Sequence, residues 1–324
     1  MSETPIPDLH DEIAYLEQQL QTARKRLAES TTQDTTTVPP TAHHISSSSP
    51  PSSDPPFPLP SPSSLSASHT LYLLSDSALP LGSFAYSSGL ESYIAHHKPL
   101  PRTTTPTSSF HRFLRLSLAS VASTTLPYLL AAYRCPSSLE TLDNDLDAST
   151  PCTVARRASI AQGLALLGVW ERALVRGPLT TGANNNDNGP RSSSSAAISA
   201  LTAFSSALKQ PTPSSSTPIE DRLNGHFAPL WGVVCLALGI ETSQAAYIFL
   251  LNHSKAVLSA AVRASVMGPY QAQGVLASQE LRGMIVQEIR VQWETKVEEA
   301  GQVVPLVDLW MGRHELLYSR IFNS

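Results

Sequence analysis

The chain has 324 residues and a formal net charge of −4, from 22 basic and 26 acidic side chains. This balance lacks the concentrated basic face that nucleic-acid-binding proteins use to hold phosphates, so we expect no nucleic-acid partner. The three cysteines, Cys135, Cys152 and Cys235, are too few for a disulfide-stapled secreted scaffold and too far apart for a zinc knuckle. We interpret them as inert thiols in a reducing compartment.

The N-terminal residues, MSETPIPDLHDEI, are acidic and polar, unlike a signal or transit peptide. The longest apolar run, Phe227 to Ile240, is closed by Glu241 and is shorter than the ~20 residues that a membrane-spanning helix needs. We therefore expect a buried helix at this run, no membrane partner and a cytoplasmic protein.

Residues 1–29 are expected to form a separate N-terminal unit. Between residues 8 and 29, apolar residues recur at spacings of three and four, which predicts an amphipathic helix with a heptad seam: Leu9, Ile13, Leu16, Leu20, Ala23 and Leu27. Three heptads are marginal for an isolated coiled coil. Two alternatives stay open, a helix with a coiled-coil partner and a frayed helix with none.

Three biased segments separate the patterned parts of the chain. From Ser30 to Thr70, 28 of 41 residues are Ser, Thr or Pro, and such a stretch buries too little apolar area to offset its ordering entropy. We interpret residues 30–69 as a disordered linker. Biased patches near 182–195 and 210–218 are typical of loop insertions in a domain that spans residues 70–324.

Residues 70–324 carry helix signals and almost no strand signals, which predicts an all-α fold: a single helical-bundle domain of roughly eight to ten helices. A helix marked by Phe110 and Phe113 is expected to break or kink at Pro127. A final long helix is expected from its cap, Ser278, until Val304-Pro305 stops the pattern. The other expected helices are Ile160–Leu174, Ala196–Lys209, His226–Ile240 and Thr242–Val266, the last two parted near Gly239 and Glu241.

Motifs for bond-making chemistry are missing from the sequence. There is no GxxxxGK[ST] phosphate loop and no G-x-S-x-G elbow, so no catalytic residue is nominated. Neighbouring side chains on a helix point about 100° apart, so His96 and His97 do not face one metal without a bend, and no metal ligands are assigned. We interpret His226 as a hydrogen-bonded histidine at a helix start. Ser75, Asp76 and Ser77 are typical helix caps and turn formers before the turn at residues 79–82.

Three stretches, in order, carry a resemblance to a known family: LYLLSDSALPLGSFAYSSGLESYI (71–94), GHFAPLWGVVCLALGI (225–240) and GRHELLYSRIFNS (312–324). They resemble the first motif, the central helix and the C-terminal tail of urease accessory protein F, a helical, non-catalytic partner in nickel delivery to urease. We call residues 71–94 the N-terminal motif and residues 312–324 the C-terminal tail. Gly268-Pro269-Tyr270 departs from the family pattern, in a stretch where the family builds part of its self-association surface.

The resemblance implies a maturation factor that scaffolds nickel insertion into apo-urease and couples a partner GTPase to metal delivery. Its partners would be a companion accessory protein of the D or H type, against which the tail becomes ordered, the accessory GTPase called G, apo-urease and a second copy of the chain in a homodimer. Nickel and GTP would be handled by the partners, with no cofactor bound directly. The implied partner-binding residues are Ser75, Asp76, Ser77, Pro80, Gly82, Phe84, Gly89, Glu91, Arg313, His314, Tyr318, Ser319, Arg320 and Phe322.

Two rival functions remain open at this point. The first is a helical enzyme that acts on a small molecule in a pocket between helices, with Glu91, His226 or Tyr247 as acid or base. The second is a coiled-coil adaptor that works through residues 8–29.

Overall fold

A computed structural model describes residues 62–99, 101, 103–175, 191–210 and 223–323, together with Gln21, which is helical. The heptad segment 8–29 otherwise lies outside the described residues, as do most of the proposed linker and parts of both insertions. By its internal contacts the chain divides into Met1–Pro58 and Leu59–Ser324, and the described fold belongs to the second unit.

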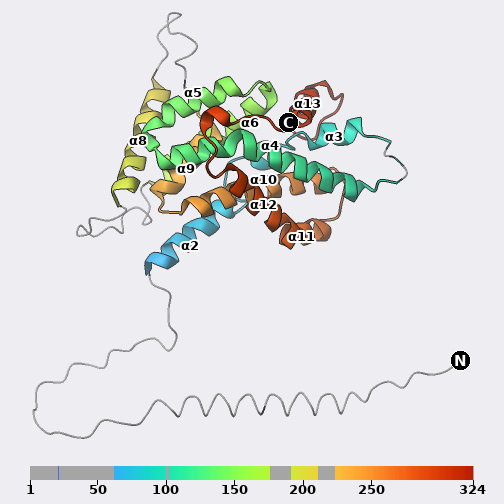
Figure 1. The fold of residues 1–324 in the computed structure, drawn as a ribbon, viewed down its shortest axis with the longest axis horizontal. Coiled ribbons are helices and arrows are strands. Elements are labelled where there is room, and N and C mark those ends of the chain that lie inside the picture. The colour runs from blue at the N-terminus through green and yellow to red at the C-terminus, as the bar shows by residue number, and fades with distance from the viewer. Residues whose placement is uncertain are drawn as a thin grey trace, which may run out of the picture. The chain divides into compact units, whose positions relative to one another are not determined.

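Every regular element among the described residues is helical (Figure 1), which confirms the all-α prediction. There are eleven α-helices in this part of the chain, against the eight to ten expected: α2 (Pro62–Ser75), α3 (Leu90–His96), α4 (Pro106–Arg134), α5 (Leu139–Ser149), α6 (Thr153–Val169), α8 (Arg191–Lys209), α9 (Phe227–Ala237), α10 (Thr242–Arg263), α11 (Pro269–Ala277), α12 (Gln279–Gln292) and α13 (Pro305–Arg313). Short 3-10 turns lie at η1 (Ser83–Ala85), η2 (Pro136–Ser138), η5 (Val297–Glu299) and η6 (His314–Leu316), and a π-helical turn, η3 (Trp170–Leu174), extends α6.

Helix α9 forms the centre of the domain because nearly all its side chains are apolar and buried. It packs against α4, α6, α8 and α10. A Cβ on Gly232 would lie 2.3 Å from the carbonyl oxygen of Leu129, so the glycine is what lets α9 approach the backbone of α4. The Trp231 indole donates a 3.0 Å hydrogen bond to the carbonyl of Ala245, which ties α9 to α10.

The start of α9 is fixed by a buried polar network around His226. The ring lies 3.0 Å through Nε2 from Asp147 Oδ1 and 3.0 Å through Nδ1 from Ser159 Oγ, and its side chain is fully buried. The Asp143 carboxylate accepts hydrogen bonds from the backbone N–H groups of Gly225 (3.0 Å) and His226 (2.6 Å). This confirms the interpretation of His226 as a hydrogen-bonded histidine at a helix start.

Of the break or kink predicted at Pro127, the break is wrong, because α4 continues through this residue to Arg134. Proline has no N–H, so the carbonyl oxygen of Ser123, four residues earlier, lacks its usual helical donor. That oxygen instead accepts a 3.2 Å hydrogen bond from the backbone N–H of Gly301. Gln302 adds a 2.9 Å bond from Nε2 to Ser120 Oγ. The segment before α13 is thereby attached to α4.

Other predicted boundaries shift. The final helix does not run to Val304: α12 ends at Gln292, and a 3-10 turn and α13 follow. Two helices begin earlier than expected, α2 at Pro62, inside the range assigned to the linker, and α8 at Arg191, inside the first insertion. The Ser278 cap is confirmed, because its hydroxyl accepts a 3.1 Å bond from the N–H of Leu281.

Helices α4 and α10 are long and apolar enough to cross a membrane, judged by length and composition alone. The buried shares of their apolar stretches, 61% and 56%, also fit helices in the core of a domain.

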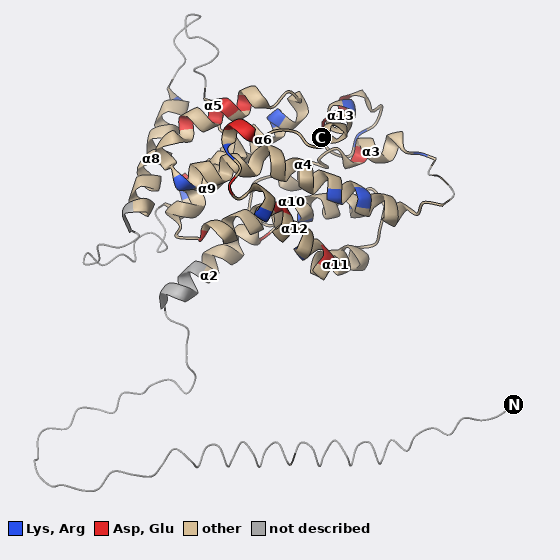
Figure 2. Cartoon of the chain, viewed as in Figure 1, with Lys and Arg blue, Asp and Glu red and all other residues tan. Residues whose placement is uncertain are grey.

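Figure 2 shows acidic residues along α5 and basic residues distributed over several helices, among them α4, α6 and α13.

Candidate partner-binding site

The N-terminal motif and the C-terminal tail, which are more than 200 residues apart in the sequence, meet in the structure (Figure 1). Helix α13 packs against α3, and the residues after it fold back toward η1. Of the residues that the resemblance singles out, Glu91 contacts His314 and Phe322 of the tail directly. Gly89 lies against α13, and Phe84 is joined to Phe322 through Arg263.

The carboxylate of Glu91 is the centre of this contact. Its Oε1 accepts a 2.7 Å hydrogen bond from the backbone N–H of Ile321, and its Oε2 accepts a 3.2 Å bond from that of Phe322. Nε2 of His314 lies 2.8 Å from the same Oε2. Only 11% of the Glu91 side chain is exposed, so a nearly buried acid holds both the backbone and a side chain of the tail.

His314 is buried completely, and its two ring nitrogens are treated differently. A carboxylate only accepts hydrogen bonds, so the neutral ring that bonds Glu91 carries its hydrogen on Nε2. Among the described residues, its Nδ1 is the single buried side-chain nitrogen or oxygen without a hydrogen-bond partner. The imidazole therefore depends on Glu91 alone for its polar contacts.

Arg263, at the end of α10, joins the motif to the tail from the other side. Its guanidinium donates to the carbonyl oxygen of Phe84 and lies 4.3 Å from the ring centroid of Phe322, a distance typical of a cation–π contact. The N–H of Asn323 donates a 2.8 Å bond to the carbonyl of Ala85. Sequence reasoning missed Arg263, since a basic residue in the last turn of a helix is also explained by the helix dipole.

Two glycines of the motif have backbone conformations that other residues rarely adopt, Gly82 with φ of +70° and Gly89 with φ of +86°. A Cβ on Gly89 would lie 3.0 Å from Met311 Cγ and 3.5 Å from Trp310 Cβ. The Trp310 ring meets that of Tyr93 edge-on, with centroids 4.7 Å apart. The close approach of α13 to α3 thus requires a glycine at position 89.

The remaining motif residues lie in the turn after α2, apart from the tail contact. Ser75 is the last residue of α2, and Asp76 Oδ1 accepts a 2.9 Å bond from the N–H of Ala78, as the turn interpretation predicted. Ser77 and Pro80 are exposed in the same turn.

The docked tail exposes aromatic, basic and apolar side chains to solvent. Tyr318 is fully exposed, and Arg313, Ser319 and Arg320 are exposed beside it. Large apolar side chains exposed in the same region are Phe84, Leu306, Leu309, Leu316 and Ile321.

The three residues of the rival enzyme do not share a site. Glu91 lies in the tail contact and His226 in the network at the start of α9, and Tyr247 lies on α10. None of the three lines the cavity between the N-terminal motif, α4, α6 and α10.

In the part of the chain that the structure describes, no group of three or more His, Cys, Asp or Glu side chains is placed to hold a metal ion. His96 and His97 each bond through Nδ1 to a carbonyl oxygen four residues earlier, Ser92 at 2.7 Å and Tyr93 at 2.8 Å. They lie at the exposed end of α3.

Comparison with known proteins agrees across most of the chain. The family model UreF matches residues 105–280. A protein of Schizosaccharomyces pombe described as an uncharacterized urease accessory protein UreF-like is 33% identical, over 81% of this chain and 99% of its own length. Urease accessory protein 6 of Cryptococcus neoformans is 27% identical, over 79% of this chain and 96% of its own. Urease accessory protein F of Arabidopsis thaliana is 30% identical, over 78% and 90%.

Proposed function

The chain belongs to the UreF family, and we propose that it is a non-catalytic scaffold of urease maturation that couples a partner GTPase to nickel delivery into apo-urease. In this proposal it acts in the cytoplasm as a homodimer. It binds a companion accessory protein of the D or H type and recruits the GTPase, while nickel and GTP are handled by these partners. Its own contribution is to hold the partners in the correct arrangement.

The observation that supports this proposal is the junction of the N-terminal motif with the tail. Glu91 holds the backbone of the tail, and Arg263 holds the ring of Phe322 on the motif. Tyr318, Arg313 and Arg320 are exposed. Tyrosine and arginine are enriched among the residues that dominate binding energy at interfaces. A tail that is already ordered loses less conformational entropy on binding, so the same contacts give higher affinity.

The resemblance implies a tail that becomes ordered against the companion protein, whereas here it is ordered on its own chain. The physical reason is that residues of the same chain bind the polar groups of the tail. Glu91 binds His314 and the N–H of Ile321, and the carbonyl of Ala85 binds the N–H of Asn323. The proposal therefore gives the companion protein the outward side chains, not the buried ones.

A direct test combines genetic complementation with co-purification. Deletion of the gene should abolish urease activity while the urease polypeptide persists, and Tyr318→Ala and Arg320→Ala should weaken co-purification with a D- or H-type protein. Matched controls are Tyr72→Ala on α2 and Arg282→Ala on α12, both exposed and outside the junction. Full urease activity in the deletion strain would refute the role, and equal retention by all four variants would refute the assigned surface.

The coiled-coil adaptor alternative is tested by truncation. Because α2 begins at Pro62 and the Leu74 carbonyl on it accepts a 2.9 Å bond from Asn252, the cut must fall before this helix. Removal of residues 1–58 should leave urease maturation intact, whereas the adaptor reading requires its loss.

A further inference from the structure

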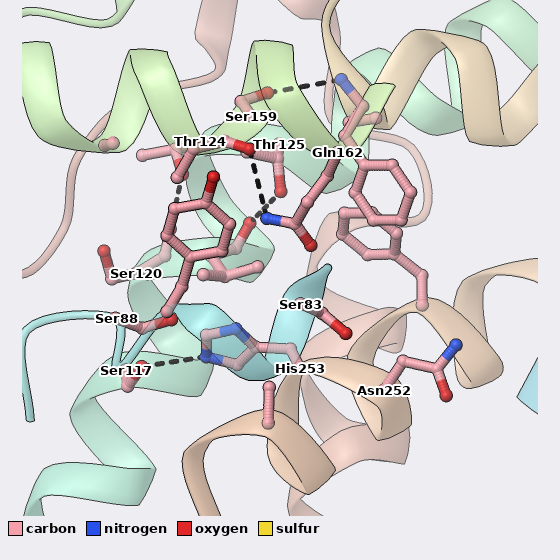
Figure 3. Close-up of a pocket in the computed structure, with 18 of the residues that line it drawn as sticks. Ser83, Ser88, Ser117, Ser120, Thr124, Thr125, Ser159, Gln162, Asn252 and His253 are labelled. Carbon is pink, nitrogen blue, oxygen red and sulfur yellow. Dashed lines mark hydrogen bonds between the residues drawn. The ribbon is translucent and has the colours of Figure 1, made fainter. Parts of the chain in front are cut away.

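A cavity of about 260 Å³ lies between the N-terminal motif, α4, α6 and α10 (Figure 3). Met311 of α13 also lines it. One water in the liquid occupies about 30 Å³, so the space is larger than a site for a single buried water and is close to the lower limit of small-molecule pockets. Hydroxyl and amide side chains line much of it: Ser83, Ser88, Ser117, Ser120, Thr124, Thr125, Ser159, Gln162 and Asn252.

Three of the hydroxyl groups in the wall use their hydrogen on the backbone. Oγ1 of Thr124, Thr125 and Thr150 donates to the carbonyl four residues earlier, at 2.7, 2.6 and 2.7 Å. Each hydroxyl has one hydrogen and two lone pairs, so these three can only accept a further hydrogen bond.

The two amide side chains each use one of their two N–H hydrogens on the backbone. Nε2 of Gln162 donates to the Ala158 carbonyl at 3.2 Å, and Nδ2 of Asn252 donates to the Leu74 carbonyl at 2.9 Å. Both amide oxygens are left without a protein partner, yet neither is among the buried unpaired atoms of the described residues. They are therefore open to solvent or to a ligand, and both are acceptors.

His253 extends into the cavity from α10, and its Nε2 lies 2.8 Å from Ser117 Oγ (Figure 3). In the described part of the chain its Nδ1 has no hydrogen-bond partner, so one ring nitrogen is available to a ligand. Burial lowers the pKa of His253 to about 4, so the ring is neutral at pH 7. The same surroundings penalise any other positive charge placed beside the ring.

Three charged residues also line the cavity. The Lys255 ammonium group donates one of its three hydrogens to the carbonyl of Ser75. Asp76 and Asp308, the other two, present carboxylate oxygens, which are again acceptors.

We propose that this cavity is a binding site for a small uncharged molecule rich in N–H donors, of the amide or urea type. Such a ligand donates to the hydroxyl and amide oxygens that have no protein donor, and its carbonyl accepts from the second N–H of Gln162 or Asn252. Because it is uncharged, it also avoids the desolvation cost of a cation. The site goes beyond the proposed scaffold function, since none of the partner proteins is needed to form it.

The test measures binding of acetamide to the purified full-length chain by saturation-transfer NMR, with two matched probes. N,N-dimethylacetamide keeps the carbonyl but has no N–H donor, and acetamidinium keeps the donors but is charged. We expect a millimolar Kd for acetamide, in keeping with its few atoms, and binding at least tenfold weaker for each of the other two. Absence of acetamide binding, equal binding of the dimethyl compound or tighter binding of acetamidinium would each overturn the proposal.

Variants then locate the site. Thr124→Val combined with Thr125→Val removes two acceptors with little change of shape and should weaken acetamide at least fivefold. Thr202→Val is the control, because Thr202 makes the same bond to the carbonyl four residues earlier, at 2.8 Å, but is exposed on α8. Gln162→Leu provides a second test if the double variant does not fold. Unchanged affinity in a folded wall variant, or an equal loss in Thr202→Val, would show that acetamide binds elsewhere.

Discussion

Replacing Glu91 with alanine is expected to release the C-terminal tail and leave the helical domain folded. The substitution removes the acceptor of two backbone N–H groups and of the His314 imidazole. Hydrogen bonds to a charged group contribute about 1.5–3 kcal/mol each, but the two amides regain water once the tail detaches. In the docked tail, the neutral His314 imidazole would remain buried without its partner, and an unsatisfied buried donor costs about 1–3 kcal/mol. We expect the free energy of tail docking to fall by about 3 kcal/mol, the upper end of that range.

Hydrogen exchange measures this release directly. At about 1.4 kcal/mol per factor of ten, a loss of ~3 kcal/mol speeds exchange at the amides of Ile321 and Phe322 by about 100-fold. Amides of α9 should be unaffected. Glu91→Gln keeps one neutral acceptor oxygen and should give about a tenfold effect, while Glu280→Ala, at an exposed acid in the first turn of α12, should give none.

Exchange at these two amides that stays within threefold of the unsubstituted chain would show that Glu91 does not hold the tail. Equally faster exchange throughout α9 would show that the acid stabilises the whole domain and not the junction.

Three further predictions concern the core. Gly163→Ala should lower the free energy of unfolding by about 2–4 kcal/mol, because its Cβ would lie 2.0 Å from the Gly225 carbonyl oxygen. Gly168→Ala on the same helix has no atom within 4 Å of the new Cβ and should raise the free energy of unfolding by ~0.5–1 kcal/mol. Urea titration compares the two variants. Asp143→Asn should lose about 2–3 kcal/mol in the same assay, since a fully buried carboxylate that accepts several backbone N–H bonds becomes neutral. The depressed pKa of His253, about 4 against 6.5, means that the unfolded chain gains this proton first as pH falls, so stability should decline between pH 6.5 and 4. The decline should be at most ~3 kcal/mol, less where cavity water screens the ring, and the slope should be shallower in His253→Gln; equal slopes would contradict the assignment.

Local chemistry explains which features can be predicted from the sequence. The Ser278 cap and the parting of α9 from α10 at Gly239, whose φ is +72°, depend on residues within one turn of each other. The start of α9 at His226 was also predicted from its immediate neighbours.

Features that depend on distant partners could not be read in this way. The pairing of Glu91 with His314 joins residues 223 positions apart, and no spacing rule links them. The sequence required only that Glu91 be exposed or paired. Arg263 carries no local signal of its contact with Phe322. Of these four residues, the family resemblance identified Glu91, His314 and Phe322, in two separate stretches, but not Arg263.

The interruption at Pro127 has a consequence for how the scaffold is built. The carbonyl oxygen of Ser123, which has no donor within α4, binds the backbone N–H of Gly301 in the segment before α13. Pro127→Ala would restore an N–H that competes with Gly301 for the Ser123 oxygen. The substitution would stabilise α4 and weaken the attachment of the segment that leads to α13. Pro127 in α4 thereby helps to fix the position of α13.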